Sequence, residues 1–182
     1  MAGEVKKRRG LIIVYTGGGK GKTTAALGAA LRACGHGWKV FMVQFIKGPW
    51  RYGELEAAKR LAPDFEIVLA GKGFYKIRGD RLPEEVHRQA AEEGLALCRE
   101  KIASGEYDLI ILDEINVAVH EGLIPVGEVL ALLDAKPEPL HLILTGRNAH
   151  PRIIERADLV TEMREVKHPY AQGIPAQRGI EY

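Results

Sequence analysis

The sequence predicts an α/β fold in which a mostly parallel sheet carries helices on both faces. Short apolar runs alternate with longer segments of helical periodicity, the pattern of repeated strand–helix–strand units. Nearly every residue of the run at 39–45 is apolar, as expected for a strand that is covered on both faces. Polar and glycine-rich segments follow the apolar runs, and in such folds ligands bind outside the carboxyl ends of the strands.

The first half of the chain contains three expected strands and two expected helices. In order, they are a strand at 11–15, a helix at 22–34, a strand at 39–45, a helix at 54–61 and a strand at 65–69. Five alanines let the first helix lie close to the sheet, and Gly35 stands where a C′ glycine ends a helix. Pro63 closes the second helix, and the segment 71–80 has no period and is expected to be irregular.

The second half continues the alternation. In order, we expect a helix from Pro83 to just before Gly105, a strand at 107–112, a helix from Pro125 to near Pro137, a strand at 140–144, a helix at 151–156 and a strand at 159–161. Proline is favoured at the first position of a helix, which supports the two proline starts. The proline- and glycine-rich tail at 167–182 should be extended and ordered by contacts. We expect a basic arm at 1–10 and a single domain at 11–182.

A glycine-rich segment between the first strand and the first helix predicts a phosphate-binding loop. Its members are Gly17, Gly18, Gly19, Lys20, Gly21, Lys22, Thr23 and Thr24. Glycines let several backbone N–H groups surround one anion, and the helix start adds unpaired N–H groups and the positive end of its dipole. In such a loop Lys22 reaches the β- and γ-phosphates and Thr23 binds Mg²⁺. The alternative is a purely structural turn.

The loop departs from the common pattern G-x-x-x-x-G-K-[ST] in one respect. The position that usually holds the first glycine is Thr16, so the loop begins at Gly17 and is one residue shorter. Even so, the strand–loop–helix context predicts a nucleoside triphosphate as ligand and a P-loop NTPase fold with a RecA-like sheet.

Asp113 and Glu114 follow the apolar run at 107–112 and form the second candidate metal-binding feature. At the strand end that faces a phosphate loop, one carboxylate binds Mg²⁺ directly or through water, and the other orients a ligand or a water. The sequence leaves open which of the two contacts the metal. The alternative is that the pair caps the segment at 115–120.

Composition narrows the classes of partner. The net charge of +2 rests on Lys6, Lys7, Arg8 and Arg9, so the rest of the chain is near neutral and predicts no nucleic-acid partner. No apolar run is long enough to cross a bilayer, which predicts a cytoplasmic protein with no membrane contact. Cys34 and Cys98, the two cysteines, have no metal or redox spacing and should be buried thiols. The basic arm is expected to be solvated.

Several local patterns together resemble a known family. They are the segments 15–24, 43–50, 73–74, 112–116, 144–147, 166–169 and 176–181. From about Arg9 to the C-terminus the chain resembles the P-loop class of ATP:cob(I)alamin adenosyltransferases, the cob(I)yrinic acid a,c-diamide adenosyltransferase family. The shortened phosphate loop is peculiar to that family. Gly18 and Val117 are departures, because the family often has asparagine and tyrosine there.

The resemblance implies a reaction at the ribose of ATP. Co(I) of a reduced corrinoid attacks C5′, triphosphate leaves, and the product serves adenosylcobalamin synthesis or salvage. ATP and Mg²⁺ are implied, with Lys20, Lys22 and Thr23 neutralising the leaving group and Asp113 or Glu114 completing the metal shell. Among the histidines, only His168 lies inside a family pattern.

The resemblance also implies an aromatic segment that displaces the lower axial ligand of the corrinoid before Co(II) is reduced. Phe74 matches the family's phenylalanine, but Lys76 stands where the family has tryptophan, and Tyr75 is the candidate substitute. The alternative is an ordinary loop with two anchoring aromatics. The implied catalytic set is therefore Lys22, Thr23, Glu114, Phe74 and Tyr75.

The remaining expectations concern partners and rival functions. Arg147 contacts the nucleotide or the corrinoid, or else forms a surface ion pair. The family implies a homodimer and an electron donor such as a flavodoxin-like reductase. The rivals are a P-loop kinase or NTPase acting at the γ-phosphate, with a basic lid at 76–81, and a RecA-like nucleotide-dependent binding protein.

Overall fold

The computed structural model describes residues 8–47, 52–73, 75–76 and 81–182, and Phe74 of the predicted corrinoid segment lies outside them. The strands are β1 Ile12–Thr16, β2 Val40–Gln44, β3 Phe65–Leu69, β4 Leu109–Asp113, β5 His141–Thr145 and β6 Leu159–Glu162. The helices are α1 Lys22–Cys34, α2 Gly53–Leu61, α3 Glu84–Ser104, α4 Ile115–His120, α5 Val126–Asp134 and α6 Pro151–Arg156, with a 3₁₀ turn at Pro169–Gln172.

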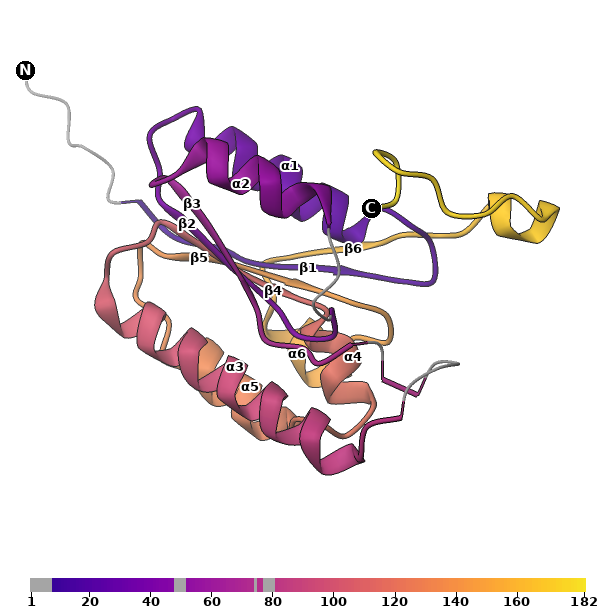
Figure 1. The fold of residues 1–182 in the computed structure, drawn as a ribbon. Coiled ribbons are helices and arrows are strands. Elements are labelled where there is room, and N and C mark those ends of the chain that lie inside the picture. The colour runs from indigo at the N-terminus through magenta and orange to yellow at the C-terminus, as the bar shows by residue number, and fades with distance from the viewer. Residues whose placement is uncertain (1–7, 48–51, 74, 77–80) are drawn as a thin grey trace, which may run out of the picture.

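The six strands form one sheet in the order β3-β2-β4-β5-β1-β6, and every pairing between them is parallel. Helices α1 and α2 cover one face of the sheet, and α3, α4, α5 and α6 cover the other (Figure 1). The predicted parallel sheet with helices on both faces is confirmed. All carboxyl ends of the strands therefore point to one edge, where the polar segments gather.

The core lies in two layers, one on each face of the sheet. Strand β2 is buried along its whole length, in agreement with its continuous apolar sequence. On the α1 face the packing is close because Ala26 and Ala30 are fully buried against the sheet. The predicted role of the alanines in α1 is thus confirmed.

Most element bounds agree with expectation, including the end of α1 at Cys34, but the residue after that end does not have the conformation predicted for it. Gly35 keeps a right-handed conformation with φ of −61° and is not a left-handed C′ residue. The chain continues in hydrogen-bonded turns, and Gly37 is the residue that adopts a left-handed φ of 72°. His36 and Gly37 extend the turn before Trp38 leads into β2. The local sequence did not indicate this longer turn. Gly105, by contrast, ends α3 in the left-handed region.

The basic arm and the two cysteines can be compared with what the sequence predicted. The described part of the basic arm is anchored, since Arg8 pairs with Asp108 at 2.7 Å and Arg9 pairs with Asp158 at 2.6 Å. Cys98 is fully buried as predicted, whereas Cys34 is only half-buried. Among the helices of the described residues, none has the length and apolarity needed to cross a membrane.

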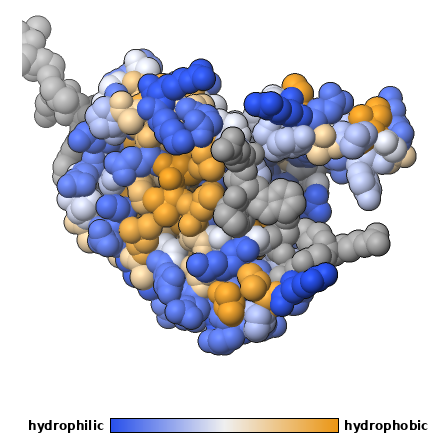
Figure 2. Space-filling view, viewed as in Figure 1, coloured by the Kyte–Doolittle hydropathy of each residue, from blue (hydrophilic) through white to orange (hydrophobic). Residues whose placement is uncertain are grey.

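The outer edge of the sheet carries an apolar groove. It lies between α2 and the edge strand β3, and its apolar lining consists of Leu55, Ala58, Ala62, Phe65, Ile67, Val68 and Leu69. Figure 2 shows apolar residues gathered on this side of the molecule. The groove is remote in sequence from the phosphate loop and contains none of the predicted site residues.

Two glycines in helix interiors give opposite predictions. A Cβ on Gly28 in α1 would meet open space, whereas a Cβ on Gly94 in α3 would lie 2.6 Å from Ala70 Cβ and 3.2 Å from the Phe45 ring. Gly28→Ala should raise the free energy of unfolding by about 0.5–1 kcal/mol. Gly94→Ala should lower it by about 1–3 kcal/mol, because overpacking outweighs helix propensity. Urea unfolding measures both, and a stabilised Gly94→Ala protein would contradict the packing described here.

Candidate active site at the carboxyl ends of the strands

The phosphate loop connects β1 to α1 and is shaped partly by a neighbour distant in sequence. Gly17 and Gly21 have left-handed φ angles of 93° and 108°. The segment that follows β6 presses on the loop: the Gly19 N–H donates to the Met163 carbonyl at 2.7 Å. A Cβ on Gly17 would lie 2.5 Å from that carbonyl oxygen. Close approach of the β6 extension therefore requires glycine at Gly17, in addition to the requirement of its φ angle.

Lys22 lies inside the loop. Its side chain is buried, and its ammonium donates to the Gly17 carbonyl at 2.8 Å and to the Gly19 carbonyl at 2.7 Å. Burial lowers the pKa of Lys22, with Arg147 acting in the same direction and the Glu114 and Asp113 carboxylates opposing it. The ammonium is thus held where it could contact a phosphate bound in the loop.

Asp113 joins four elements at the strand ends. It is fully buried, and its Oδ1 accepts hydrogen bonds from Thr23 Oγ1 at 2.8 Å and from Thr145 Oγ1 at 2.7 Å. Its Oδ2 accepts from Gln44 Nε2 at 3.1 Å. The structure therefore brings the predicted metal residues Thr23 and Asp113 into direct contact, and it adds Gln44 and Thr145 as their supports.

Glu114 differs from Asp113 in geometry and in environment. It has a left-handed φ of 63° and precedes α4, yet its side chain makes no capping hydrogen bond to that helix. Its N–H donates to Thr145 Oγ1 at 2.9 Å, which helps to hold this conformation. Burial and the neighbouring Asp113 raise the pKa of Glu114, against the opposing charges of Lys22, Lys47 and Arg147. Capping, the alternative interpretation of the acidic pair, is not the role that this geometry supports.

A third carboxylate lies beside this pair and was not predicted. Glu54 accepts a hydrogen bond from Lys47 at 2.5 Å, and Lys47 also lies 3.8 Å from Asp113 Oδ2. Gln44 Nε2 is 3.3 Å from Glu54, so it contacts both carboxylates. Burial would raise the pKa of Glu54, but the hydrogen bond and charge of Lys47, with Gln44, hold it below its usual range. The position of Gln44 and Lys47 at the end of β2 was the signal available in the sequence.

The other predicted nucleotide residues are placed around the loop. Lys20 forms an ion pair with Glu181 of the C-terminal tail at 2.7 Å. Thr24 is exposed on the first turn of α1, and a Cβ on Gly18 would meet open space. Arg147 makes no ion pair with any residue that the structure describes, although its charge acts on the pKa values of Lys22 and Glu114. Arg147 therefore lies close to the site and is not neutralised by a surface partner in the described chain.

Tyr75 is anchored against α3. Its hydroxyl donates to Glu84 at 2.8 Å, and its ring lies 5.1 Å from the His87 ring. The Lys76 ammonium lies 4.7 Å from the centre of the Tyr75 ring and 3.1 Å from Glu121. These contacts agree with the interpretation of Tyr75 as an anchoring aromatic.

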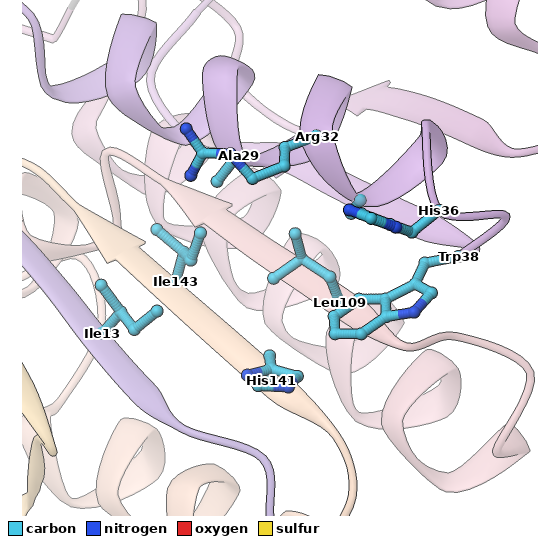
Figure 3. Close-up of a pocket in the computed structure, with 9 residues that line it drawn as sticks. Ile13, Ala29, Arg32, His36, Trp38, Leu109, His141 and Ile143 are labelled. Atoms are coloured by element: carbon cyan, nitrogen blue, oxygen red, sulfur yellow. The ribbon is translucent and has the colours of Figure 1, made fainter. Parts of the chain in front are cut away.

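Two observations limit where metals and ligands bind. Within the described residues, no group of three His, Cys, Asp or Glu side chains forms a metal site, so a Mg²⁺ ion here would depend on phosphate and water ligands as well. An apolar hollow of about 180 Å³ lies between α1 and strands β1, β4 and β5, beside the stacked rings of Trp38 and His141 (Figure 3). That hollow adjoins the amino ends of β4 and β5, away from the predicted site.

Comparison with known proteins gives one consistent answer. The family model described as ATP:corrinoid adenosyltransferase BtuR/CobO/CobP matches residues 8–182. A corrinoid adenosyltransferase of Escherichia coli (strain K12) is 40% identical over 98% of this chain and 89% of its own length. The corresponding protein of Pseudomonas aeruginosa is 39% identical over 98% of this chain and 87% of its own.

A solved structure is similar in fold. The crystal structure of the RadB recombinase superposes with a TM-score of 0.53 and 14% sequence identity, covering 88% of this chain and 77% of that one. At this identity the similarity concerns the fold alone, and it confirms the predicted RecA-like P-loop fold.

The raised pKa of Glu114 predicts a pH-dependent cost to stability. Between its ordinary pKa and the raised one, the folded protein holds a proton that the unfolded chain releases, so stability falls as pH rises through that window. Glu114→Gln should therefore raise the free energy of unfolding at about pH 8 but leave it unchanged at about pH 4. Urea unfolding across this range measures the effect, with Glu92→Gln on the exposed side of α3 as control. A Glu114→Gln protein that is less stable at pH 8 would contradict this account.

Proposed function

This chain belongs to the ATP:corrinoid adenosyltransferase family and is a corrinoid adenosyltransferase, and we propose that it transfers the 5′-deoxyadenosyl group of ATP to Co(I). The Co(I) centre of a reduced corrinoid donates an electron pair to C5′ of the ribose. The bond between C5′ and the triphosphate oxygen breaks, triphosphate leaves with the bonding pair, and cobalt becomes formally Co(III). The product is an adenosylated corrinoid, used in adenosylcobalamin synthesis or salvage.

The observation that carries this proposal is the loop shortened by one residue, with a buried lysine at its centre. In this reaction the protein must bind a triphosphate as a leaving group rather than attack its γ-phosphorus. Lys22 inside the loop and Lys20 at its rim place two positive charges beside the phosphates, where the helix start and the loop N–H groups add partial charge. Such preorganised charges stabilise the departing anion.

The residues proposed for Mg²⁺ are Thr23, Asp113 and Glu114. They offer the hard oxygen ligands that Mg²⁺ prefers. The buried Oε1 of Gln44, beside Asp113, has no hydrogen-bond partner among the described residues and is suited to accept from a metal-bound water. When bound, Mg²⁺ would neutralise charge that develops on the leaving triphosphate. Asp113 would hold the Thr23 hydroxyl in place, and the half-buried Glu114 remains available as a ligand.

A kinase or NTPase acting at the γ-phosphate is the alternative. Such an enzyme needs a group that accepts a proton from, or orients, the attacking oxygen. Asp113 already accepts hydrogen bonds from Thr23, Thr145 and Gln44, so it is poorly placed to act as a base. A kinase or NTPase would also use the basic segment 76–81 as a lid, and in that segment Lys76 forms an ion pair with Glu121 and lies over the Tyr75 ring. Because Co(I) is itself the nucleophile, adenosyl transfer requires no protein base.

The corrinoid would bind beside the segment that includes Phe74 and Tyr75. We propose that Phe74 displaces the lower axial ligand and that Tyr75, anchored against α3, faces the corrin in place of the family's tryptophan. Arg147 would contact the nucleotide or the corrinoid side chains. A homodimer, a cytoplasmic location, an electron donor such as a flavodoxin-like reductase and the absence of a nucleic-acid partner complete the proposal. We also propose that residues 1–10 form a basic arm and that residues 11–182 form a single domain.

One experiment separates the proposed reaction from its rivals. The protein is incubated anaerobically with ATP, Mg²⁺ and chemically reduced cobalamin, while corrinoid absorbance and phosphate products are followed. The proposal expects an alkyl-corrinoid spectrum together with inorganic triphosphate. Release of phosphate or ADP without a new cobalt–carbon bond would overturn it in favour of chemistry at the γ-phosphate.

Lys22→Ala should reduce turnover by about 100-fold or more, because the leaving triphosphate loses a buried charge aimed at it. Steady-state kinetics with prereduced cobalamin measures the loss. Lys59→Ala, on the exposed part of α2, is the control and should retain activity. Comparable activity in both variants would contradict the phosphate assignment.

Phe74→Ala should impair activity that starts from Co(II) more than activity that starts from prereduced Co(I). The reason is that the proposed role of Phe74 lies in the reduction step, which precedes adenosyl transfer. Parallel assays from the two oxidation states measure the difference. Tyr75→Phe keeps the ring but loses the hydrogen bond to Glu84, and should behave like the parent in both assays. Equal loss from both states in Phe74→Ala would assign that residue a structural role.

A further inference from the structure

The C-terminal segment 176–182 has no part in the function described so far, yet it lies against the phosphate loop. Its backbone forms a compact turn: the Gln177 carbonyl accepts from the N–H groups of Ile180 and Glu181, and the Gly179 N–H donates to the Tyr182 carbonyl at 2.8 Å. Figure 1 shows this end of the chain beside the start of α1. After β6 the chain runs away from the sheet through the 3₁₀ turn at Pro169–Gln172, and segment 176–182 then turns back (Figure 1). It ends at the edge of the sheet where the nucleotide is proposed to bind.

One ion pair holds the segment there, and the end of the chain lies near the start of α2. The Glu181 carboxylate lies 2.7 Å from the Lys20 ammonium, and the Glu181 side chain is only 16% exposed. The Tyr182 backbone lies 4.0 Å from the position that a Cβ on Gly53 would occupy, so the segment also reaches the start of α2. It thus extends from the phosphate loop towards the neighbouring helix start.

Lys20 is the loop cation that a ligand can most easily recruit. Lys22 is buried and donates to two loop carbonyls, whereas the Lys20 side chain is 48% exposed. A triphosphate bound by the loop brings several negative charges towards the same ammonium. The Glu181 carboxylate would then face a like-charged ligand at short range, which is unfavourable. Lys20 cannot keep its close contact with Glu181 and also serve the triphosphate fully.

We propose that Glu181 is the partner of Lys20 in the nucleotide-free protein and that the triphosphate of ATP displaces it, releasing segment 176–182 from the loop. This inference rests on the proposed function, because it requires ATP in the phosphate loop. Glu181 is a positioning residue in this account: it holds Lys20 beside the loop and competes with the nucleotide.

Hydrogen–deuterium exchange at short labelling times tests the displacement in the intact protein, with Mg²⁺ and ATP but without corrinoid. We expect slower exchange in loop residues 17–24 and faster exchange in residues 176–182 when ATP is added. A protected loop with an unchanged or protected C-terminal segment would overturn this inference and leave nucleotide binding intact. An unprotected loop at saturating ATP would overturn the nucleotide site and this inference together.

Calorimetric titration of ATP into variants tests the competition. Glu181→Gln removes the competing charge, and should lower the Kd for ATP by up to about fivefold, the range expected for an ion pair near the protein surface. Glu92→Gln removes the same charge on α3, which covers the other face of the sheet, and should leave the Kd unchanged (Figure 1). An unchanged or higher Kd in Glu181→Gln would mean that Glu181 does not compete with the nucleotide, contrary to the proposal.

Discussion

The buried carboxylate of Asp113 is the group on which the arrangement of this site depends. A charge with no exposure to water is costly unless hydrogen bonds compensate for it, and here three donors do so. Those donors are Thr23 from α1, Thr145 from β5 and Gln44 from β2. Since each must be present at the correct distance, the carboxylate fixes the start of α1 relative to three neighbouring strand ends. The phosphate loop is positioned through the same contacts, because Thr23 follows Lys22 directly.

Around Asp113 the site brings acidic and basic side chains together in a partly buried environment. Glu114 is held in a left-handed conformation, and its pKa is raised by burial and by Asp113. Lys22 has its pKa lowered by burial. The charged forms of both groups are therefore less favourable in the folded protein than in water, as is common where a site is prearranged for a charged ligand. The Lys47–Glu54 ion pair adds no net charge to the site. The Lys47 ammonium nevertheless lies 3.8 Å from Asp113 Oδ2, just beyond the end of β2.

The two lysines of the phosphate loop have different surroundings. Lys22 is enclosed by the loop itself, whereas Lys20 faces the C-terminal segment and pairs with Glu181. The β6 extension also packs on the loop through Met163. The phosphate loop is recognisable from its own local sequence, yet it contacts two later parts of the chain: the extension of β6 and the C-terminal segment. These contacts show how later parts of the chain reach the loop.

Local sequence determined the elements, and tertiary structure decided their contacts. The bounds of α1, β3 and α6 were predictable because apolar periodicity, alanine content and a proline start act within each segment. A phosphate loop facing an acidic strand end predicted that Thr23 would lie near Asp113 or Glu114, and the fold decided that the Thr23 hydroxyl donates to Asp113. Gln44 and Thr145 were not predicted as partners of Asp113, because their meeting depends on the strand order that places β2 and β5 on either side of β4. The contact between Lys20 and Glu181 could not be predicted either, since a tail without periodicity carries no local signal of where it folds back. Residues distant in the chain meet only through the arrangement of the sheet, and that arrangement is a property of the whole fold.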